Sequence, residues 1–327
     1  MPNTPLTIAL PSKGRIEEGT TAFFGQAGLS LHKQAGARDY RGKLAGIPDT
    51  EVVFLSAGEI PAALESGAAH IGITGEDLLR DRCAEFEQKI SLITDLGFSR
   101  ADVVVAVPRA WIDVGNMADL EEVAHDFRTR HGRHMRVATK YFRLTRRFFA
   151  EHGLVDYRIV ESAGATEGAP ASGFAEIIVD ITTTGGTLAA NNLKVLEDGV
   201  ILKSEAKLAA SLAAHWSGRA RMALGYFLNA LWAAEQAQYI MLNFRAPADP
   251  LALSGNLQST FGDKIDYTPQ PGREQTLLCP VRRMHAVAAF LRSMGVTDSI
   301  KPARVDVSGG NNRWLEALLP HLPALPQ

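Results

Sequence analysis

The sequence has 327 residues, of which 46% are hydrophobic and 21% are charged, and this composition excludes a disordered chain. Its 34 basic and 36 acidic side chains give a formal net charge of −2 at pH 7, so no overall positive field is available to recruit nucleic acid or anionic lipid. At about 150 residues per domain, the length accommodates two domains and leaves a remainder.

Short apolar runs alternate with helix-like segments through the first two thirds of the chain, which is typical of an α/β protein. Strands are expected at residues 6–10, 51–55, 70–73, 91–95, 103–107, 136–139, 157–161, 176–180 and 199–203. Helices are expected at residues 60–66, 117–130, 142–152 and 188–192. From residue 205 to 238 apolar side chains recur at helical spacing and predict one long helix, although two glycines weaken it.

The pattern changes after residue 238. Strands are expected at 239–244, 264–268, 276–281 and 300–307, and helices at 251–261, from Met284 to a stop at Gly295, and at 314–319. Leaving out the final short helix, the order is β-α-β-β-α-β, which is that of a ferredoxin-like module.

The segment 176–188 carries the sharpest chemical signal, because an apolar strand ends in Asp180 and a loop of threonines and glycines leads into a helix. Glycines let a backbone approach a ligand closely, and hydroxyls with free N–H groups at a helix start suit phosphate. Asp180 would then hold ribose hydroxyls or orient a metal-bound ligand. The alternative is a turn that merely caps a helix, since neither Gly-Lys-Ser/Thr nor Gly-x-Gly-x-x-Gly is present.

The surrounding residues resemble the signature of the ATP phosphoribosyltransferases, the family that catalyses the first step of histidine biosynthesis. The matching positions are Glu167, Gly173, Ala175, Ile178, Asp180, Thr184, Gly185, Thr187 and Leu188. Segments 8–15, 59–77 and 138–148 resemble the same family in the expected order, with Phe142 in place of its usual proline. The resemblance covers about residues 5–210 and weakens after residue 238.

This resemblance implies an α/β fold with a two-lobed, periplasmic-binding-protein-like catalytic core and a C-terminal ferredoxin-like domain. The first lobe with its long helix is expected in residues 1–102 and 196–235, and the second lobe, with the phosphoribosyl pyrophosphate loop, in 103–195. The chain would cross to the second lobe near residue 103 and return near 195. Residues 236–327 would form a regulatory or assembly domain.

The family's reaction joins N1 of ATP to C1 of phosphoribosyl pyrophosphate and expels pyrophosphate. No protein nucleophile is needed, and the sequence shows no convincing Ser-His or Cys-His arrangement. The enzyme must instead align two polyanions and neutralise the charge that develops on pyrophosphate. Mg²⁺ is expected to arrive on the substrate phosphates, so no residue is assigned as a metal ligand.

Site residues follow from the matched motifs. Catalytic roles are expected for Lys13 and Arg15, which would meet pyrophosphate or triphosphate oxygens, and for Asp180, which would face the ribose. The expected substrate-binding residues are Thr182, Thr184, Gly185, Gly186 and Thr187 in the phosphate loop, Gly75, Glu76 and Asp77 on the opposite wall, and Tyr141 against the nucleotide. Lys13 and Tyr141 taken alone would be read as an exposed turn and a core or rim aromatic.

The alternative function is a two-lobed small-molecule binding protein without catalysis, which would carry an export signal and lack the phosphate loop. The expected partners are ATP and phosphoribosyl pyrophosphate, with neither nucleic acid nor membrane. The family implies a homo-oligomer, with either L-histidine as inhibitor of the third domain or a regulatory subunit that resembles histidyl-tRNA synthetase. Residues 238–243 resemble the start of that third domain, but its later motifs are not matched.

Cysteine and histidine usage adds little chemistry. Cys279 lies in an apolar run and is expected in the core, whereas Cys83 lies among charges and is expected on a helix surface. A cytoplasmic protein with both thiols reduced is the better interpretation, although one bridge between them remains an alternative. His125, His131 and His134 cluster at a charged helix end, which favours a solvated surface over a metal site.

Overall fold

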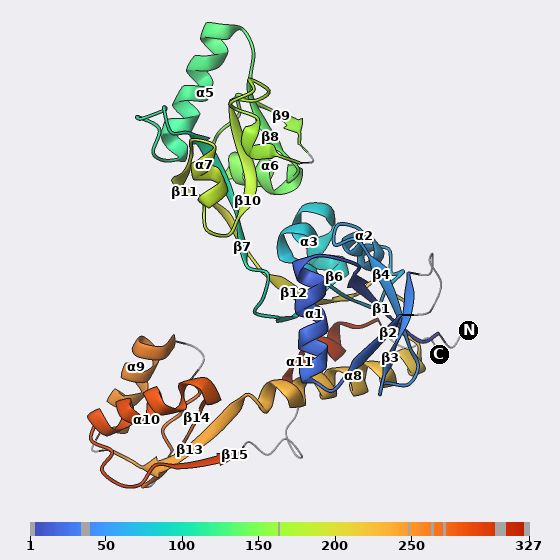
Figure 1. Cartoon of the computed structure of the whole chain (residues 1–327), viewed down its shortest axis with the longest axis vertical. Coiled ribbons are helices and arrows are strands. Elements are labelled where there is room, and N and C mark those ends of the chain that lie inside the picture. The colour runs from blue at the N-terminus through green and yellow to red at the C-terminus, as the bar shows by residue number, and fades with distance from the viewer. Residues whose placement is uncertain are drawn as a thin grey trace. The chain divides into compact units, whose positions relative to one another are not determined.

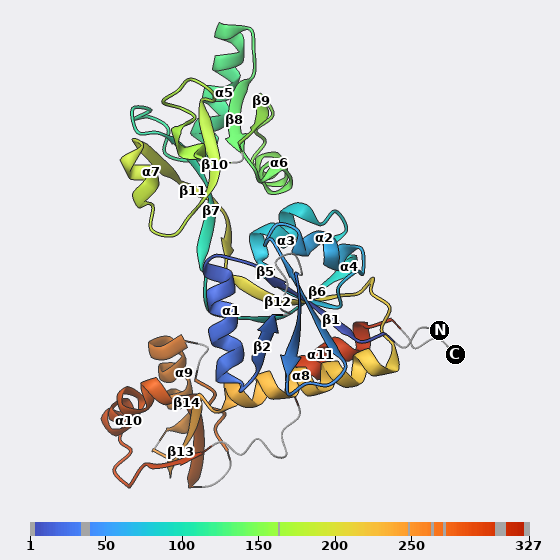
Figure 2. The ribbon, with the colours of Figure 1, turned by 45° about the vertical axis from the view of Figure 1, so that its right-hand side comes forward.

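The computed structural model (Figures 1 and 2) describes residues 4–33, 40–162, 164–247, 249–262, 265–270, 273–304 and 312–323. It forms two compact units. The first comprises Met1–Phe23, Ser30–Leu224 and Ala317–Gln327, and the second comprises Phe24–Leu29 and Gly225–Glu316.

The first unit contains a seven-stranded sheet in the order β2-β3-β4-β1-β5-β12-β6, which with its helices we call lobe one. Its strands are β1 (Leu6–Pro11), β2 (Ser30–Lys33), β3 (Arg41–Ala45), β4 (Thr50–Leu55), β5 (Ile71–Gly75), β6 (Ile90–Asp95) and β12 (Ala206–Ser211). Strands β1, β4 and β5 are parallel, so their carboxyl ends meet at one edge of the sheet. Its helices are α1 (Arg15–Gln26), α2 (Ile60–Glu65), α3 (Glu76–Arg82) and α4 (Phe86–Lys89), and the last three gather near β5 in Figure 2.

The same unit contains a five-stranded sheet in the order β11-β7-β10-β8-β9, which with its helices we call lobe two. Its strands are β7 (Ala101–Pro108), β8 (Met135–Thr139), β9 (Tyr157–Glu161), β10 (Ile177–Thr182) and β11 (Leu193–Ser204). Its helices are α5 (Met117–His131), α6 (Phe142–Glu151), α7 (Gly186–Ala190) and the 3-10 turn η1 (Thr166–Gly168). Strands β8, β9 and β10 are parallel, and β11 stays paired with β7 as far as Ser204, past the expected return near residue 195.

The second unit is built on a three-stranded antiparallel sheet in the order β14-β13-β15. Its elements are β13 (Tyr239–Arg245), α9 (Pro250–Phe261), β14 (Glu274–Pro280), the 3-10 turn η3 (Val281–Arg283), α10 (Met284–Ser293) and β15 (Lys301–Arg304). Leu242, Phe244 and Leu277 of this sheet are buried with Leu253 and Val287 of the helices in a core of their own. The long helix α8 (Gly218–Gln236) and the short α11 (Arg313–Leu318) each contribute residues to both units, and the turn η4 (Leu319–His321) follows α11.

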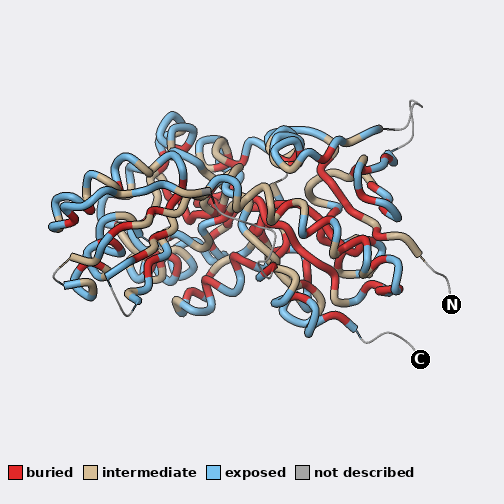
Figure 3. The backbone as a smooth tube through the Cα atoms, turned by 90° about the horizontal axis from the view of Figure 1, so that it is seen from below, coloured by how far each residue is buried: buried red, intermediate tan, exposed pale blue. Residues whose placement is uncertain are grey.

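Buried stretches are drawn in red in Figure 3. Every residue of β12 is buried, as are Leu6 and Ile8 of β1. In lobe two the largest core cluster joins β7, β8 and β10 to α5 and α6, with Phe149 fully buried. The predicted α/β class, with a two-lobed core and an additional C-terminal sheet, is confirmed. The domain boundaries stay a prediction, and the second compact unit begins at Gly225, inside α8.

The long helix predicted from residue 205 is wrong in its first part, where β12 lies between β5 and β6. The segment consists mainly of alanine and leucine, which are strong helix formers. Burial on both faces of a central strand overrides that preference, because small and aliphatic side chains fit between two packed layers. The helix itself, α8, begins only at Gly218.

Two further predictions need correction. The strand expected at 264–268 is a single bridge between Asp266 and Leu278, with Lys264 outside the described residues. The strand expected at 300–307 is described as β15 as far as Arg304, and residues 305–307 lie outside the described residues. Cys83 does not lie on a surface: it is 3% exposed, and burial raises its pKa to about 11. It packs with Ile60, Leu64 and Leu79 in an apolar cluster of lobe one, and this contact outweighs the charged sequence around it. Cys279 is buried as predicted, and both thiols are free.

Candidate active site

A polar cavity of about 380 Å³ lies at the carboxyl end of β10. Because β8 and β10 are parallel, the residues that follow them emerge at the same edge of the sheet, where ligands bind in open α/β sheets. The lining residues are Arg15 at the start of α1, Glu167 of η1, and Asp180, Ile181, Thr182, Thr183, Thr184, Gly186, Thr187 and Leu188. Lobe one therefore contributes a cation and lobe two contributes hydroxyls and carboxylates.

The loop after β10 is held by its own threonines. The N–H of Gly185 donates to Thr182 Oγ1 at 2.9 Å, and the N–H of Gly186 donates to Thr184 Oγ1 at 3.4 Å. Gly185 has φ +73°, in the left-handed region that favours glycine. This turn directs the chain into α7, whose first N–H groups have no partner within the helix.

Asp180 and Glu167 place two carboxylates in the same cavity. Burial raises the pKa of Asp180, and the nearby Glu167 acts in the same direction. The N–H of Ile181, which donates to Asp180 Oδ1 at 2.8 Å, and the charge of Lys140 both lower it. Carboxylates that accept hydrogen bonds beside a loop of N–H and hydroxyl donors suit a ligand with both sugar hydroxyls and a phosphate.

The structure places Arg15, Asp180, Thr182, Thr184, Gly186 and Thr187 around this cavity, and Gly185 lies in the loop between Thr184 and Gly186. Their roles in binding stay a prediction. Lys13 is exposed in the turn between β1 and α1 and does not line this cavity. Its neighbour Gly14 has φ +83°, which fixes the turn that presents Arg15.

The other predicted residues, Gly75, Glu76, Asp77 and Tyr141, have protein partners of their own. Tyr141 is 1% exposed, and its hydroxyl donates to Asp77 Oδ2 at 2.9 Å. Glu76 is 8% exposed, and it accepts from Arg80 at 2.6 Å and pairs with Lys207 at 3.0 Å. A Cβ on Gly75 would lie 2.3 Å from Asp77 Oδ1, so a glycine is needed there to make room for that carboxylate.

Glu167 and Thr183 also line the cavity, although no contact was expected for them from the sequence. Glu167 belongs to the matched signature, and its spacing from Asp180 was the signal that could have identified it. Thr183 lies between two residues that were predicted. Lys140 does not line the cavity, but it follows β8 and its charge lowers the pKa of Asp180; its place beside Tyr141 in the matched segment 138–148 could have pointed to it.

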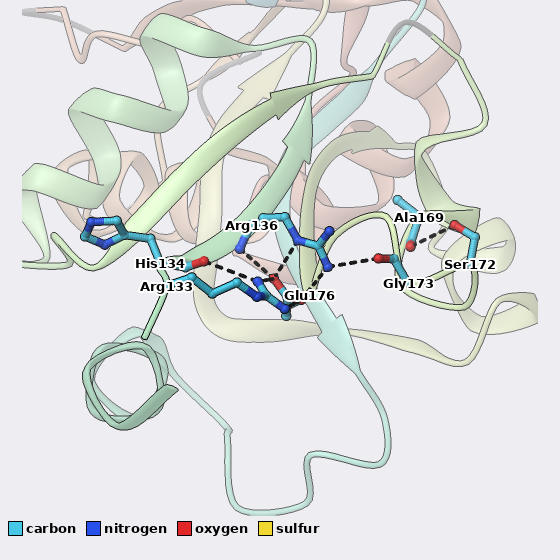
Figure 4. Close-up of polar contacts among 7 residues, drawn as sticks. All are labelled: Arg133, His134, Arg136, Ala169, Ser172, Gly173 and Glu176. Carbon is cyan, nitrogen blue, oxygen red and sulfur yellow. Dashed lines mark hydrogen bonds and ion pairs between the residues drawn. The ribbon is translucent and has the colours of Figure 1, made fainter. Parts of the chain in front are cut away.

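The loop that carries Glu167 into β10 is tied down by two arginines (Figure 4). Arg136 Nη2 donates to the Gly173 carbonyl at 2.9 Å and to Glu176 Oε1 at 2.8 Å, and Arg133 Nη2 donates to Glu176 Oε1 at 3.0 Å. Ser172 Oγ donates to the Ala169 carbonyl at 3.0 Å within the same loop. These bonds hold the far end of the segment that lines the cavity.

The histidine cluster is an exposed one. His125 and His134 lie beside the buried Asp156, with Nδ1 to carboxylate distances of 3.2 and 3.6 Å, and Arg128 donates to the same carboxylate at 2.6 Å. His131 stacks on Phe127 with ring centroids 4.3 Å apart. Among the helices of the described residues, none combines the length and apolar character required to span a bilayer.

Comparison with known proteins gives consistent matches. Residues 56–225 match the family model HisG, described as ATP phosphoribosyltransferase. An ATP phosphoribosyltransferase of Afipia carboxidovorans is 53% identical over 294 residues, which is 89% of this chain and 90% of the relative. One of Nitrobacter winogradskyi is 52% identical over 305 residues, 93% of this chain and 94% of the relative. The solved ATP phosphoribosyl transferase (HisG:HisZ) complex from Thermotoga maritima matches at TM-score 0.54 and 25% identity, over 70% of this chain and 97% of that chain.

Proposed function

The chain belongs to the ATP phosphoribosyltransferase family, and from this premise we propose how its residues bind the two substrates. The enzyme transfers the phosphoribosyl group of phosphoribosyl pyrophosphate to N1 of ATP and releases pyrophosphate, in the first step of histidine biosynthesis. A binding protein without catalysis is set aside, because relatives that match about nine tenths of the chain are transferases.

The observation that carries the proposal is the cavity, which joins a hydroxyl-rich loop to two carboxylates and one arginine. We assign the 5′-phosphate of phosphoribosyl pyrophosphate to the loop 182–187, where N–H groups and threonine hydroxyls donate hydrogen bonds. Asp180 and Glu167 accept hydrogen bonds from the ribose hydroxyls. Because both are acceptors when ionised, they complement hydroxyls and disfavour a second phosphate at that end.

Arg15 faces the departing pyrophosphate in this assignment, and Lys13 meets pyrophosphate or triphosphate oxygens from the neighbouring turn. A cation near the leaving group stabilises the negative charge that develops as the C1–O bond breaks. Mg²⁺ enters with the substrate phosphates, as expected for an ion that retains its waters and binds phosphate oxygens. Substrate contacts by Gly75, Glu76, Asp77 and Tyr141 stay a prediction.

Thr187→Val tests the loop assignment. It removes one hydroxyl donor at the start of α7 while keeping the side-chain shape, and it is expected to raise KM for phosphoribosyl pyrophosphate about tenfold, the loss of one hydrogen bond to a charged group. KM for ATP should change little. Thr129→Val on the exposed face of α5 is the matched control. An unchanged KM for phosphoribosyl pyrophosphate in Thr187→Val would refute the assignment.

We also propose that the second unit serves regulation or assembly. The HisG of Thermotoga maritima is matched in a complex with HisZ, over 97% of its own length but only 70% of this chain, so this chain has additional residues. Two regulatory arrangements follow: L-histidine binds the added unit, or a second kind of subunit associates with it. A homo-oligomer in the cytoplasm completes the proposal.

A further inference from the structure

Three elements meet at one buried carboxylate. Asp77, the second residue of α3, is 5% exposed; its Oδ2 accepts from the Tyr141 hydroxyl at 2.9 Å and its Oδ1 accepts from Ser204 Oγ at 2.8 Å. Ser204 Oγ in turn accepts from the N–H of Asp77 at 3.1 Å. Tyr141 precedes α6 and Ser204 ends β11, so one side chain of lobe one holds two segments of lobe two.

A second carboxylate of the same helix caps α6. Asp81 is 6% exposed, and its Oδ1 accepts from the N–H groups of Arg143 at 2.8 Å and Leu144 at 3.1 Å. These N–H groups belong to the first turn of α6, where no partner within the helix is available. α6 has no capping side chain of its own, because its N-cap residue is Tyr141. Asp81 of lobe one therefore supplies the hydrogen-bond acceptor that the first N–H groups of α6 do not find in lobe two.

Bonds within the same segment restrict it further. The N–H of Tyr141 donates to Thr139 Oγ1 at 2.9 Å, and Thr145 Oγ1 donates to the Tyr141 carbonyl at 2.6 Å. Lys140 lies between these anchors, two residues after Ala138, and Asp180 lies two residues after Ile178, the parallel partner of Ala138 in β10. The Lys140 Nζ lies 5.1 Å from the centroid of the Tyr141 ring. That distance is within the range of a cation–π contact, so the tyrosine ring also restrains the lysine side chain.

We infer that Asp77, Tyr141 and Asp81 are positioning residues that fix the start of α6, so that Lys140 holds its positive charge beside Asp180 at the edge of the cavity. This inference rests on the proposed function of that cavity. In it, Tyr141 and Asp77 act through Lys140, because the Tyr141 hydroxyl donates to the Asp77 carboxylate, which also accepts from Ser204. Lys140 adds a second cation, on the lobe-two side, to the charge that Arg15 supplies from lobe one.

The electrostatics of the site agree with this geometry. Lys140 lowers the pKa of Asp180 against burial and against Glu167, which would both favour the protonated acid. An ionised Asp180 accepts hydrogen bonds from sugar hydroxyls, whereas a protonated one would donate. A lysine held here thus keeps the Asp180 carboxylate ionised and also attracts the negative charge of the substrate phosphates.

A double-mutant cycle tests the inference. Tyr141→Phe removes the hydroxyl that Asp77 holds, Lys140→Ala removes the cation, and the third variant combines them. Lys140→Ala is expected to lower kcat/KM for phosphoribosyl pyrophosphate about tenfold in the parent enzyme, and less than about threefold when Tyr141→Phe is present, because coupled residues are not additive. Full additivity of the two effects would overturn the inference.

The controls separate positioning from stability. Tyr157→Phe removes a hydroxyl from β9 in the same lobe, where the ring packs edge-on against Phe149, and should leave kcat/KM unchanged. Asp81→Asn keeps an acceptor for the N–H groups of α6 and should retain most activity, whereas Asp81→Ala should resemble Tyr141→Phe in the cycle. If Asp81→Ala leaves the effect of Lys140→Ala undiminished, the positioning role of Asp81 is refuted.

Thr187→Val, measured alongside, distinguishes the two proposals. If it raises KM for phosphoribosyl pyrophosphate while the cycle is additive, the cavity assignment stands and only the positioning inference fails. If it leaves that KM unchanged, the assignment of the cavity fails, and the inference that rests on it fails with it.

Discussion

Replacing Glu176 by glutamine is a direct test of how the segment that leads to the loop 182–187 is anchored. Glu176 begins the segment that enters β10, and its side chain is 13% exposed. Arg136 contacts both of its oxygens, through Nη2 at 2.8 Å and through its backbone N–H at 2.7 Å, and Arg133 adds two more bonds. Glutamine keeps the size and one acceptor oxygen but removes the charge that both arginines need.

The magnitude follows from the carboxyl's acidity. Burial alone would raise the pKa of Glu176, but the hydrogen bonds from Arg136 and Arg133 lower it from 4.5 to about 2. At about 1.4 kcal/mol for each tenfold change in proton affinity, this corresponds to about 3 kcal/mol. The guanidinium side chains are 31% and 46% exposed, so solvent screening reduces the expected contribution to about 1–2 kcal/mol.

Chemical denaturation at several pH values measures this contribution. A lowered carboxyl pKa stabilises the fold above pH 4.5, and that stabilisation is lost as the pH falls from 4.5 toward 2. The free energy of unfolding of Glu176→Gln should therefore be about 1–2 kcal/mol lower than that of the parent enzyme at pH 7, and the difference should shrink as the pH falls toward 2. Glu122→Gln, on the exposed face of α5, should change nothing. Equal stabilities of Glu176→Gln and the parent at pH 7 would refute the reasoning.

Two predictions concern other parts of the chain. Burial lowers the pKa of His70. Its Nδ1 accepts from the N–H of Thr7 at 3.0 Å, and its Nε2 lies 3.0 Å from the His215 carbonyl. Because the folded state favours the neutral ring, His70 stabilises the fold above pH 6.5, and this stabilisation is lost as the pH falls below that value. His70→Gln should cost about 1–3 kcal/mol at pH 8 and less at pH 5.5 in denaturation experiments, and a pH-independent difference would contradict the assignment. Titration calorimetry of the full chain with L-histidine is expected to show a heat of binding, and light scattering is expected to give the mass of an oligomer. If calorimetry shows no heat of binding, L-histidine is not the ligand of the second unit.

The strand, loop and helix at residues 177–190 could be predicted from sequence because the information that specifies them is local. Strand β10 with Asp180 is followed by the threonines and glycine at 182–185 and then by α7. Hydrogen bonds between close neighbours in the sequence set the conformation of this segment. Arg15 could be assigned only through the family's motif order, because its approach to the loop depends on contacts between distant segments. The strand β12 was missed for the opposite reason, since its local preference for helix is overridden by burial between two strands.

Asp77 and Tyr141 show where a motif identifies residues but not their partners. Both belong to segments matched to the family, and an acid beside glycine or an aromatic after a strand is a reasonable guess for a substrate contact. Their hydrogen bond joins positions 64 residues apart, and no periodicity in either segment encodes it. The same applies to Lys140, whose relation to Asp180 depends on the parallel pairing of β8 with β10.

The contacts of helix α3 explain why the segment 76–82 contains three acidic residues. The helix has seven residues, too few to be stable by itself, yet it buries Glu76, Asp77 and Asp81. Each carboxylate has a partner from a different element: Lys207 of β12, Ser204 of β11 with Tyr141, and the first N–H groups of α6. Removing one partner would leave a buried carboxylate with fewer hydrogen bonds, and Asp81, whose polar partners are N–H groups of α6, would lose the most if α6 moved. If the positioning inference holds, a substrate that shifts the start of α6 must break hydrogen bonds to Asp77 and Asp81. Helix α3 therefore couples the edge of the cavity to the sheet of lobe one.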